Sequence, residues 1–350
     1  MSLGTFRELF AYNDWAWDAV AGPAAELPAD KLDQVFDMGP GTIRKTLHHI
    51  WGAEKVWLDR WREGGKPPFA EFDPATSISG LTTLRRETCA QRESFLATLT
   101  DSDLPREITF TTIRDNTTYT LPLAPLMLHV CHHGVHHRAQ VLNMLKRVGA
   151  TIPPRGIDYL FMKMKALKAD PAETDRPRLS LLMIRELFDN GDWAQQRVLA
   201  VACKLPATAL DREFDMGLKT IRATLLHVLY AESWWLENWI GKTKPEFKEF
   251  DASLAMEDLP RRHTEHAAAR NAFLCSLSDG DLNRMVHTQP APGKEFVFPL
   301  GPSMLQLWHH GAHHRAQLVN MLRHVGVALP EVDVIKWLLE KRVAGEGGRA

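Results

Sequence analysis

The sequence predicts an all-α protein built from two tandem four-helix bundles. Apolar residues recur at three- and four-residue spacing in four long segments of the first half, which is the pattern of amphipathic helices. The second half repeats the first, so we expect one domain in each half with the same order of helices. A chain of 350 residues, 45% of them hydrophobic, is long enough for two cores of ordinary size.

The internal repeat is clearest in two pairs of segments. LDQVFDMGPGTIRKTLHHIWGAEKVWLDRW begins at Leu32, and LDREFDMGLKTIRATLLHVLYAESWWLENW begins at Leu210. HHGVHHRAQVLNMLKRVG begins at His132, and HHGAHHRAQLVNMLRHVG begins at His309. Because the similarity spans most of each half, each copy is a whole domain and not a short repeat unit.

The domain boundaries follow from this repeat. The segment ALKADPAETDRPR is polar and charged and contains two prolines, which is typical of a linker. We therefore expect a first bundle over residues 1–165, a linker over 166–178 and a second bundle over 179–350.

The first half contains four long helical segments and two shorter elements. The helical spacing predicts helices over residues 3–21, 42–62, 78–99 and 123–148, and a shorter last helix over 158–165. Gly22 and Pro23 are expected to end the first helix. A threonine-rich stretch, with TFTT and TYTL inside residues 107–121, predicts a short extended hairpin. The second half repeats this pattern.

Charge and hydropathy exclude several classes of protein. The net charge of −1 provides no general basic field to hold nucleic acid or an anionic membrane. No apolar run reaches the roughly 20 residues of a membrane helix. The N-terminal residues lack the charged-then-apolar order of a signal peptide. We expect a cytoplasmic protein with no nucleic-acid or membrane partner.

The cysteines do not indicate a disulfide framework or a cysteine-type zinc site. There are four of them, and none is in a CxxC motif. They are expected to be small buried residues without chemical function. They are Cys89, Cys131, Cys203 and Cys275.

Histidines cluster on the fourth predicted helix of each copy. Residues four apart lie one turn apart on the same helix face, so two imidazoles with this spacing can share one metal ion. His133 and His137 lie in a mostly apolar row, and His310 and His314 lie in the matching row of the second copy. Buried imidazoles need partners for their nitrogens, and a metal ion supplies one to both. These two pairs are our predicted ligands.

A third ligand is expected from the second helix, because three histidines leave an open coordination position. His48 and His49 are adjacent candidates there. His48 aligns with Leu226 in the second copy, whereas His49 aligns with His227. The predicted metal sites are therefore His49, His133 and His137 in the first copy, and His227, His310 and His314 in the second. The alternative is a buried cluster of hydrogen-bonded histidines.

The other histidines of these helices lie in a polar row. His132, His136, His309 and His313 are expected to be solvated or to support the ligands from outside, not to bind the metal. Arg138 and Gln140 follow the last ligand of the first copy, and Arg315 and Gln317 follow that of the second. An arginine or a glutamine there could orient a ligand or bind an anionic substrate group. The alternative is an ordinary capping contact or surface ion pair.

Four charged residues are expected on the inner faces of the bundles. Glu54 and Glu232 lie five residues after the third ligand, which turns them away from the same metal ion. We interpret them as ion-pair partners or as a base. Arg92 and Arg270 lie on the inner row of the third helix and are expected to be paired there.

At these residues the sequence resembles the DinB/YfiT-like superfamily of metal-dependent proteins. The resemblance rests on TLHHIWGAE followed by HHGVHHRAQVLNML, and both copies match it. It implies four-helix bundles with a divalent metal ion, most often zinc or nickel, in an open site of three histidines. The ligands that it implies are the same six histidines. Because single-domain relatives often form dimers, a tandem chain is expected to reproduce such a pair internally with pseudo-two-fold symmetry, and further homo-oligomers are compatible with this.

The resemblance also suggests an activity. Its better-understood members use low-molecular-weight thiols, as transferases or isomerases. A thiol or water molecule bound at an open metal position loses its proton near neutral pH. The main hypothesis is thus an enzyme that activates a thiol cosubstrate, or water, to attack a small molecule. The alternative is a non-catalytic stress-response bundle whose metal is structural or sensed. DNA binding is suggested only by the family's name, and the charge balance argues against it.

Overall fold

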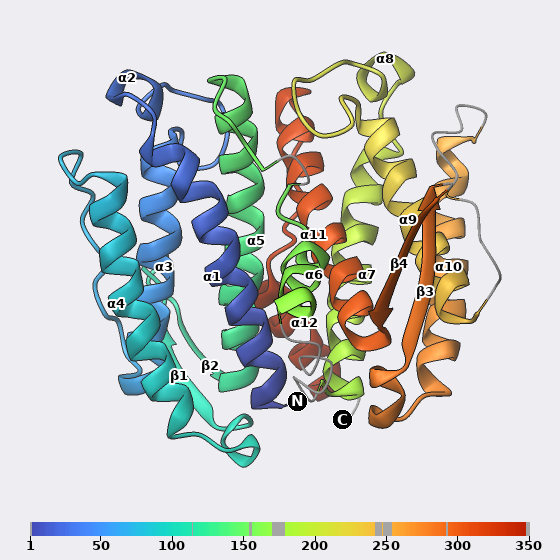
Figure 1. The fold of residues 1–350 in the computed structure, drawn as a ribbon, viewed down its shortest axis with the longest axis horizontal. Coiled ribbons are helices and arrows are strands. Elements are labelled where there is room, and N and C mark those ends of the chain that lie inside the picture. The colour runs from blue at the N-terminus through green and yellow to red at the C-terminus, as the bar shows by residue number, and fades with distance from the viewer. Residues whose placement is uncertain are drawn as a thin grey trace. The chain divides into compact units, whose positions relative to one another are not determined.

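Two sets of four long helices dominate the structure (Figure 1). It is a computed structural model that describes residues 2–113, 115–153, 156–169, 179–241, 247, 254–291 and 293–347. Contacts between residues divide the chain into two compact units. Unit 1 comprises Met1–Ile157 and Asp333–Ala350, and unit 2 comprises Asp158–Val332.

Unit 1 is a four-helix bundle with a small hairpin. Each long helix packs against two others, so that α1 and α3 lie diagonally opposite, as do α4 and α5. Its elements are α1 (Leu3–Ala25), α2 (Ala29–Leu32), α3 (Ile43–Glu63), α4 (Ile78–Ala97), the 3-10 helix η1 (Asp101–Asp103), β1 (Glu107–Thr111), β2 (Thr118–Pro122), α5 (Leu123–Arg147) and, from the end of the chain, α12 (Val334–Gly347).

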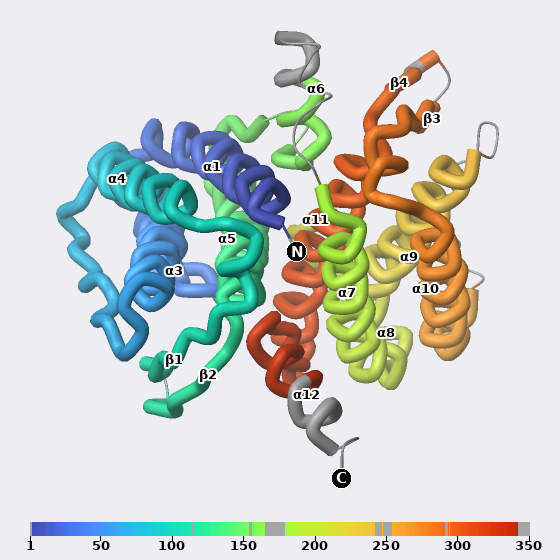
Figure 2. The backbone as a smooth tube through the Cα atoms, turned by 90° about the horizontal axis from the view of Figure 1, so that it is seen from below, coloured from blue at the N-terminus to red at the C-terminus, as the bar shows by residue number. Residues whose placement is uncertain are grey.

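Unit 2 has the same architecture (Figure 2). The helices α7, α9, α10 and α11 form its bundle, and α6 packs against α11. Its elements are α6 (Tyr159–Ala169), α7 (Leu181–Ala202), α8 (Ala207–Leu210), α9 (Ile221–Trp239), η3 (Met256–Asp258), α10 (Leu259–Cys275), η4 (Asp279–Asn283), β3 (Met285–Ala291), β4 (Lys294–Pro299) and α11 (Leu300–His324). The predicted fold class, all-α with two copies of one helical domain, is confirmed.

Side-chain caps explain where several of these helices begin. The hydroxyl groups of Thr42 and Thr220 accept hydrogen bonds from the third backbone N–H of α3 and α9. Gly64, with a φ of 71°, ends α3, because a left-handed conformation costs glycine little. The two helices that carry the third predicted ligands thus begin at equivalent threonines.

The predicted end of the first helix was wrong. The helix α1 continues through Pro23 to Ala25. A proline in the last turn removes one backbone hydrogen bond. Val20 and Ala24, one turn apart, are completely buried, so packing against the bundle offsets that loss.

The predicted hairpin is present as β1 and β2. They pair in antiparallel register from Glu107 opposite Pro122 to Thr111 opposite Thr118. The hydroxyl groups of Thr111 and Thr118 lie 2.9 Å apart on the exposed face, whereas Phe110 is buried on the other face. Threonine suits both the pleated backbone and these cross-strand contacts.

The last helix of each repeat belongs to the other repeat's unit. The helix α12 ends the second repeat but packs against α5 in unit 1, and α6 ends the first repeat but packs against α11 in unit 2. The predicted boundary at residue 165 follows the sequence repeat and stays a prediction, as do the pseudo-two-fold relation and any oligomer. Of the predicted linker, residues 170–178 lie outside the described residues.

Candidate metal centres

Three predicted ligands meet in unit 1. His49 comes from α3, and His133 and His137 lie one turn apart on α5. The Nε2 atoms of His49 and His133 are 3.0 Å apart, and the ring centres of His133 and His137 are 4.4 Å apart. One nitrogen from each of the three rings falls within 4.8 Å of the other two. The neighbouring His48 is not in this group, since its Nε2 donates to the carbonyl oxygen of Glu71.

Unit 2 repeats the arrangement with His227, His310 and His314. The Nε2 atoms of His227 and His310 are 2.9 Å apart, and the rings of His310 and His314 are centred 4.4 Å apart. Their candidate ligand nitrogens also lie within 4.8 Å of one another. The structure therefore brings together all six predicted ligands as two groups of three. That they bind a metal stays a prediction.

The protonation state of these rings suits a cation. Burial lowers the pKa of His133 and His137 well below the ordinary value, and neighbouring imidazoles lower it further. The same causes lower the pKa of His310 and His314. The rings are therefore neutral near pH 7 and can each offer a lone pair.

The spacing of the nitrogens also fits a metal ion. Two nitrogens at about 2.0–2.1 Å from a tetrahedral zinc ion would lie roughly 3.3 Å apart. The separations of 3.0 Å and 2.9 Å between Nε2 atoms need to open only slightly. Among the described residues, no fourth histidine, cysteine or carboxylate joins either group. Each of the six residues is partly exposed, although its ring is surrounded closely enough to lower its pKa, so a coordination position can stay accessible.

The polar row of the fourth helix is less exposed than predicted. His132 and His309 are 6% and 2% exposed, so of the two roles predicted for them only solvation is contradicted, and support of the ligands from outside stays a prediction. The reason is tertiary, because α12 packs against α5 and α6 packs against α11. Tyr159 of α6, for example, stands with its ring centre 5.6 Å from that of His309. His136 and His313 are only partly buried.

The helices α12 and α6 also bring a polar contact to each ligand helix. Asp333, just before α12, places a carboxylate oxygen 3.2 Å from Nδ1 of His129, one turn before His133. The residue that matches His129 in unit 2 is Gln306, whose side-chain oxygen accepts a hydrogen bond from the backbone of Leu160. Sequence reasoning missed these contacts, because they join segments far apart in the chain.

Arg138 and Arg315 lie in the interior and form no surface ion pair with the described residues. Arg138 is completely buried, donates to the side-chain oxygen of Asn13 at 2.6 Å and lies 5.4 Å from the ring centre of Tyr12. Gly191 replaces that asparagine in unit 2, and the Nε and Nη2 atoms of Arg315 have no hydrogen-bond partner among the described residues. Burial lowers the pKa of Arg315 to about 10. Both side chains point into the bundle, away from a surface role.

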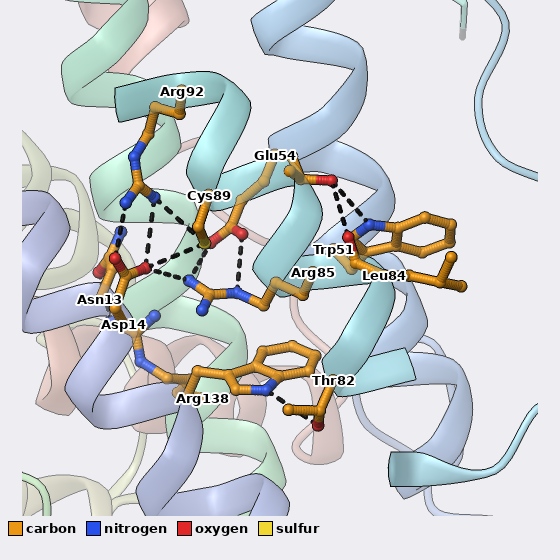
Figure 3. Close-up of polar contacts among 12 residues, drawn as sticks. Asn13, Asp14, Trp51, Glu54, Thr82, Leu84, Arg85, Cys89, Arg92 and Arg138 are labelled. Carbon is orange, nitrogen blue, oxygen red and sulfur yellow. Dashed lines mark hydrogen bonds and ion pairs between the residues drawn. The ribbon is translucent and has the colours of Figure 1, made fainter. Parts of the chain in front are cut away.

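A largely buried ion-pair network, with Asp14 at its partly exposed edge, joins three helices of unit 1 (Figure 3). Arg85 of α4 lies 2.8 Å from Asp14 of α1 and 2.8 Å from Glu54 of α3. Arg92 pairs with Asp14 at 2.6 Å, as predicted for that arginine. Burial opposes ionisation of Asp14, but the two guanidinium groups overcome it and lower its pKa. Burial raises the pKa of the adjacent Cys89 thiol to about 12, so it remains protonated.

The equivalent network of unit 2 is weaker. Arg270 pairs with Asp192, as predicted, but His263 replaces Arg85. Its Nε2 atom is 3.8 Å from Asp192 and 3.9 Å from Glu232, too far for hydrogen bonds. Burial raises the pKa of Glu232 and lowers the pKa of His263 to about 4. The imidazole is thus neutral at pH 7 and cannot replace the guanidinium charge.

Two further expectations concern the whole described chain. All four cysteines are free thiols. The expectation that they are buried is confirmed only for Cys131, because Cys89 and Cys203 are partly exposed and Cys275 is exposed. In the described part of the chain, every helix is too short or too polar to cross a membrane.

Comparison with known proteins agrees with this geometry. The sequence model of the DinB family matches the chain twice, over residues 1–176 and 178–342. Protein DinB of Bacillus subtilis (strain 168) is 27% identical over 165 residues, which cover 42% of this chain and 89% of that protein. That protein thus corresponds in length to one of the two repeats. On these grounds, the chain belongs to the DinB family and contains two copies of its domain.

Proposed function

We propose that each unit binds one divalent metal ion in its histidine triad, zinc or nickel by preference, and that the protein uses this open site to activate a small thiol or water. The observation that carries the proposal is the convergence of three imidazole nitrogens within 4.8 Å in both units. Membership of the DinB family supports it.

The chemistry follows from the donor set. Three neutral imidazoles leave the full charge of a divalent ion in place, which lowers the pKa of a thiol or water molecule that binds there. The resulting nucleophile would attack an electrophilic small molecule, with a low-molecular-weight thiol as cosubstrate in a transferase or isomerase, or with water in a hydrolase. Because the six residues are partly exposed, a cosubstrate can reach them.

The first test is the metal content of tag-free full-length protein, purified without chelator and measured by elemental mass spectrometry. We expect two ions per chain, and one ion in each of the variants His137→Ala and His314→Ala. His48→Leu is a matched control. It introduces the leucine that the second repeat has at this position and leaves all six ligands in place, so the variant should retain both ions. Wild-type protein that is folded as purified but contains no bound metal would contradict the proposal.

The second test separates an active site from a structural one. Metal is removed with a chelator, and the fold is followed by circular dichroism before thiol-transfer and hydrolysis assays with restored zinc or nickel. We expect the fold to survive and activity to require the metal. Complete unfolding on metal removal would favour the structural alternative, because the binding energy would then be folding energy.

A further inference from the structure

A glutamine contacts one member of each histidine triad. Gln140 follows His137 by three residues on α5, and its Oε1 atom is 2.8 Å from Nδ1 of that ring. Its Nε2 atom is 3.2 Å from Nε2 of His136. In this arrangement His137 donates from Nδ1 and keeps its Nε2 lone pair free, while His136 accepts from the amide. The glutamine thus selects the tautomer of His137 that can bind a metal through Nε2.

A loop glycine confines this amide. Gly39, in the DMG sequence between α2 and α3, has a φ of 50° and lies against the end of the Gln140 side chain. A Cβ atom at this position would overlap Oε1 and lie 2.9 Å from Cδ of Gln140. Both the backbone conformation and the close approach therefore favour glycine.

The loop itself is anchored to the bundle. The backbone N–H of Phe36 donates to the carbonyl oxygen of Gly41 at 2.7 Å, and Gly41 donates back to Met38 at 3.0 Å. The side chains of Phe36 and Met38 are 7% and 1% exposed. The glycine that confines Gln140 is thus part of a braced turn, so the amide has little freedom to move away from His137.

Unit 2 contains the same arrangement. Oε1 of Gln317 is 2.8 Å from Nδ1 of His314, and its Nε2 is 2.9 Å from Nε2 of His313. Gly217 also has a φ of 50°, and a Cβ there would lie 2.8 Å from Cδ of Gln317. The two residues after each glycine differ between the repeats, PG in one and LK in the other. The contact is therefore retained even where the loop sequence is not.

From this geometry we propose that Gln140 and Gln317 are positioning residues for the metal centres. Each fixes the tautomer and orientation of the last ligand of its triad, and Gly39 and Gly217 keep it in place. The inference rests on the proposed metal binding and assigns a function to the glutamine and the glycine that the two repeats share. The alternative is that this contact only packs the loop on the helix.

The experiment measures one site at a time. In a full-length His314→Ala background, which retains only the triad of unit 1, cobalt(II) affinity is measured by competition with a chelator and by its visible absorption. Gln140→Leu removes the acceptor and should weaken cobalt binding roughly 10- to 100-fold. Gln140→Glu keeps a carboxylate acceptor for Nδ1–H and should bind within about threefold of the parent. Gly39→Ala should behave like Gln140→Leu, because it displaces the amide.

The readouts separate positioning from packing. Thermal unfolding of the metal-free variants reports packing, whereas the cobalt absorption and affinity report the ligand. Unchanged cobalt affinity in Gln140→Leu, or failure of the folded Gln140→Glu variant to restore it, would overturn the positioning role. If the His314→Ala parent itself bound no cobalt, the metal proposal would fall first and this inference with it. The matching Gln317 variants in a His137→Ala background repeat the test in unit 2.

Discussion

The two units share a histidine triad but differ in the charges buried beside it. In unit 1, Arg85 bridges Asp14 and Glu54 at hydrogen-bond distance. In unit 2, His263 occupies the equivalent position and forms no hydrogen bond among the described residues. The distances between the ligand rings are nevertheless nearly the same in both. The triad geometry therefore does not depend on whether an arginine or a histidine lies beside the carboxylates inside the bundle.

The comparison separates residues that differ between the two units from residues that both units share. Trp17 lies under Arg85, with its ring 4.8 Å from the guanidinium carbon, and Gln195 takes its place in unit 2. By contrast, the glutamine and the glycine next to the triad are present in both units. Support of the ligands was retained through the duplication, whereas the ion pairs deeper in the bundle changed together with their neighbours.

The largest expected contrast is the loss of stability when Arg85 of unit 1 or the equivalent His263 of unit 2 is replaced. Arg85→Leu leaves the buried carboxylate of Glu54 without its guanidinium partner, which should destabilise unit 1 by roughly 3–5 kcal/mol. Asp14, whose side chain is 36% exposed, keeps its pair with Arg92 and adds little to this cost. His263→Leu removes a buried ring without hydrogen bonds and should cost unit 2 less than about 1 kcal/mol. Hydrogen exchange of backbone amides in the full chain resolves the two units. Equal losses would show that the networks are equivalent after all.

Acid should also affect the units differently. The pKa of His263 is about 4 in the folded protein, against about 6.5 when unfolded. Between these values the unfolded state binds a proton that the folded state does not, so stability falls as the pH falls, by about 2 kcal/mol at pH 5. Below about pH 4 this loss stops growing. Arg85 stays charged throughout and has no such effect.

The measurement compares thermal unfolding of the wild type and His263→Leu at pH 7 and pH 5. The metal-site histidines titrate in both proteins, so their contribution cancels in the difference. If the difference in melting temperature between the two proteins were the same at both pH values, His263 would be excluded as the source of the acid sensitivity.

The smallest contrast concerns Asp158 and Asp333, which directly precede α6 and α12. Burial raises the pKa of Asp158 to about 6. The folded protein therefore holds this proton more tightly than the unfolded chain, and stability falls as the pH rises from about 4 to 6. Asp158→Asn should therefore stabilise the protein by about 1–3 kcal/mol at pH 7. Asp333 is 49% exposed and pairs with His129, so Asp333→Asn should destabilise by less than about 1 kcal/mol. Melting temperatures at pH 7 test this, and shifts of the same sign would contradict it.

Much of the candidate site follows from helical spacing and the internal repeat. Ligands on the same helix must lie one turn apart, which identifies pairs such as His133 and His137. The second copy then separates His49 from His48, because only His49 has a histidine counterpart. The recurrence of Gln140 in both copies also indicates it as a residue that could orient a ligand, and the same comparison could have indicated Gly39. Their contact could not be foreseen, because it joins a loop and a helix about 100 residues apart.

By itself, the sequence determined the helical class, the duplication and the six clustered histidines. Periodicity and repetition can be read along the chain and do not depend on which helices pack together. Only the tertiary structure decided where the last helix of each repeat packs. An apolar face on α6 or α12 can be buried against either bundle, and its sequence reads the same in both cases. That choice covers the polar row of the ligand helices and places Asp333 beside His129.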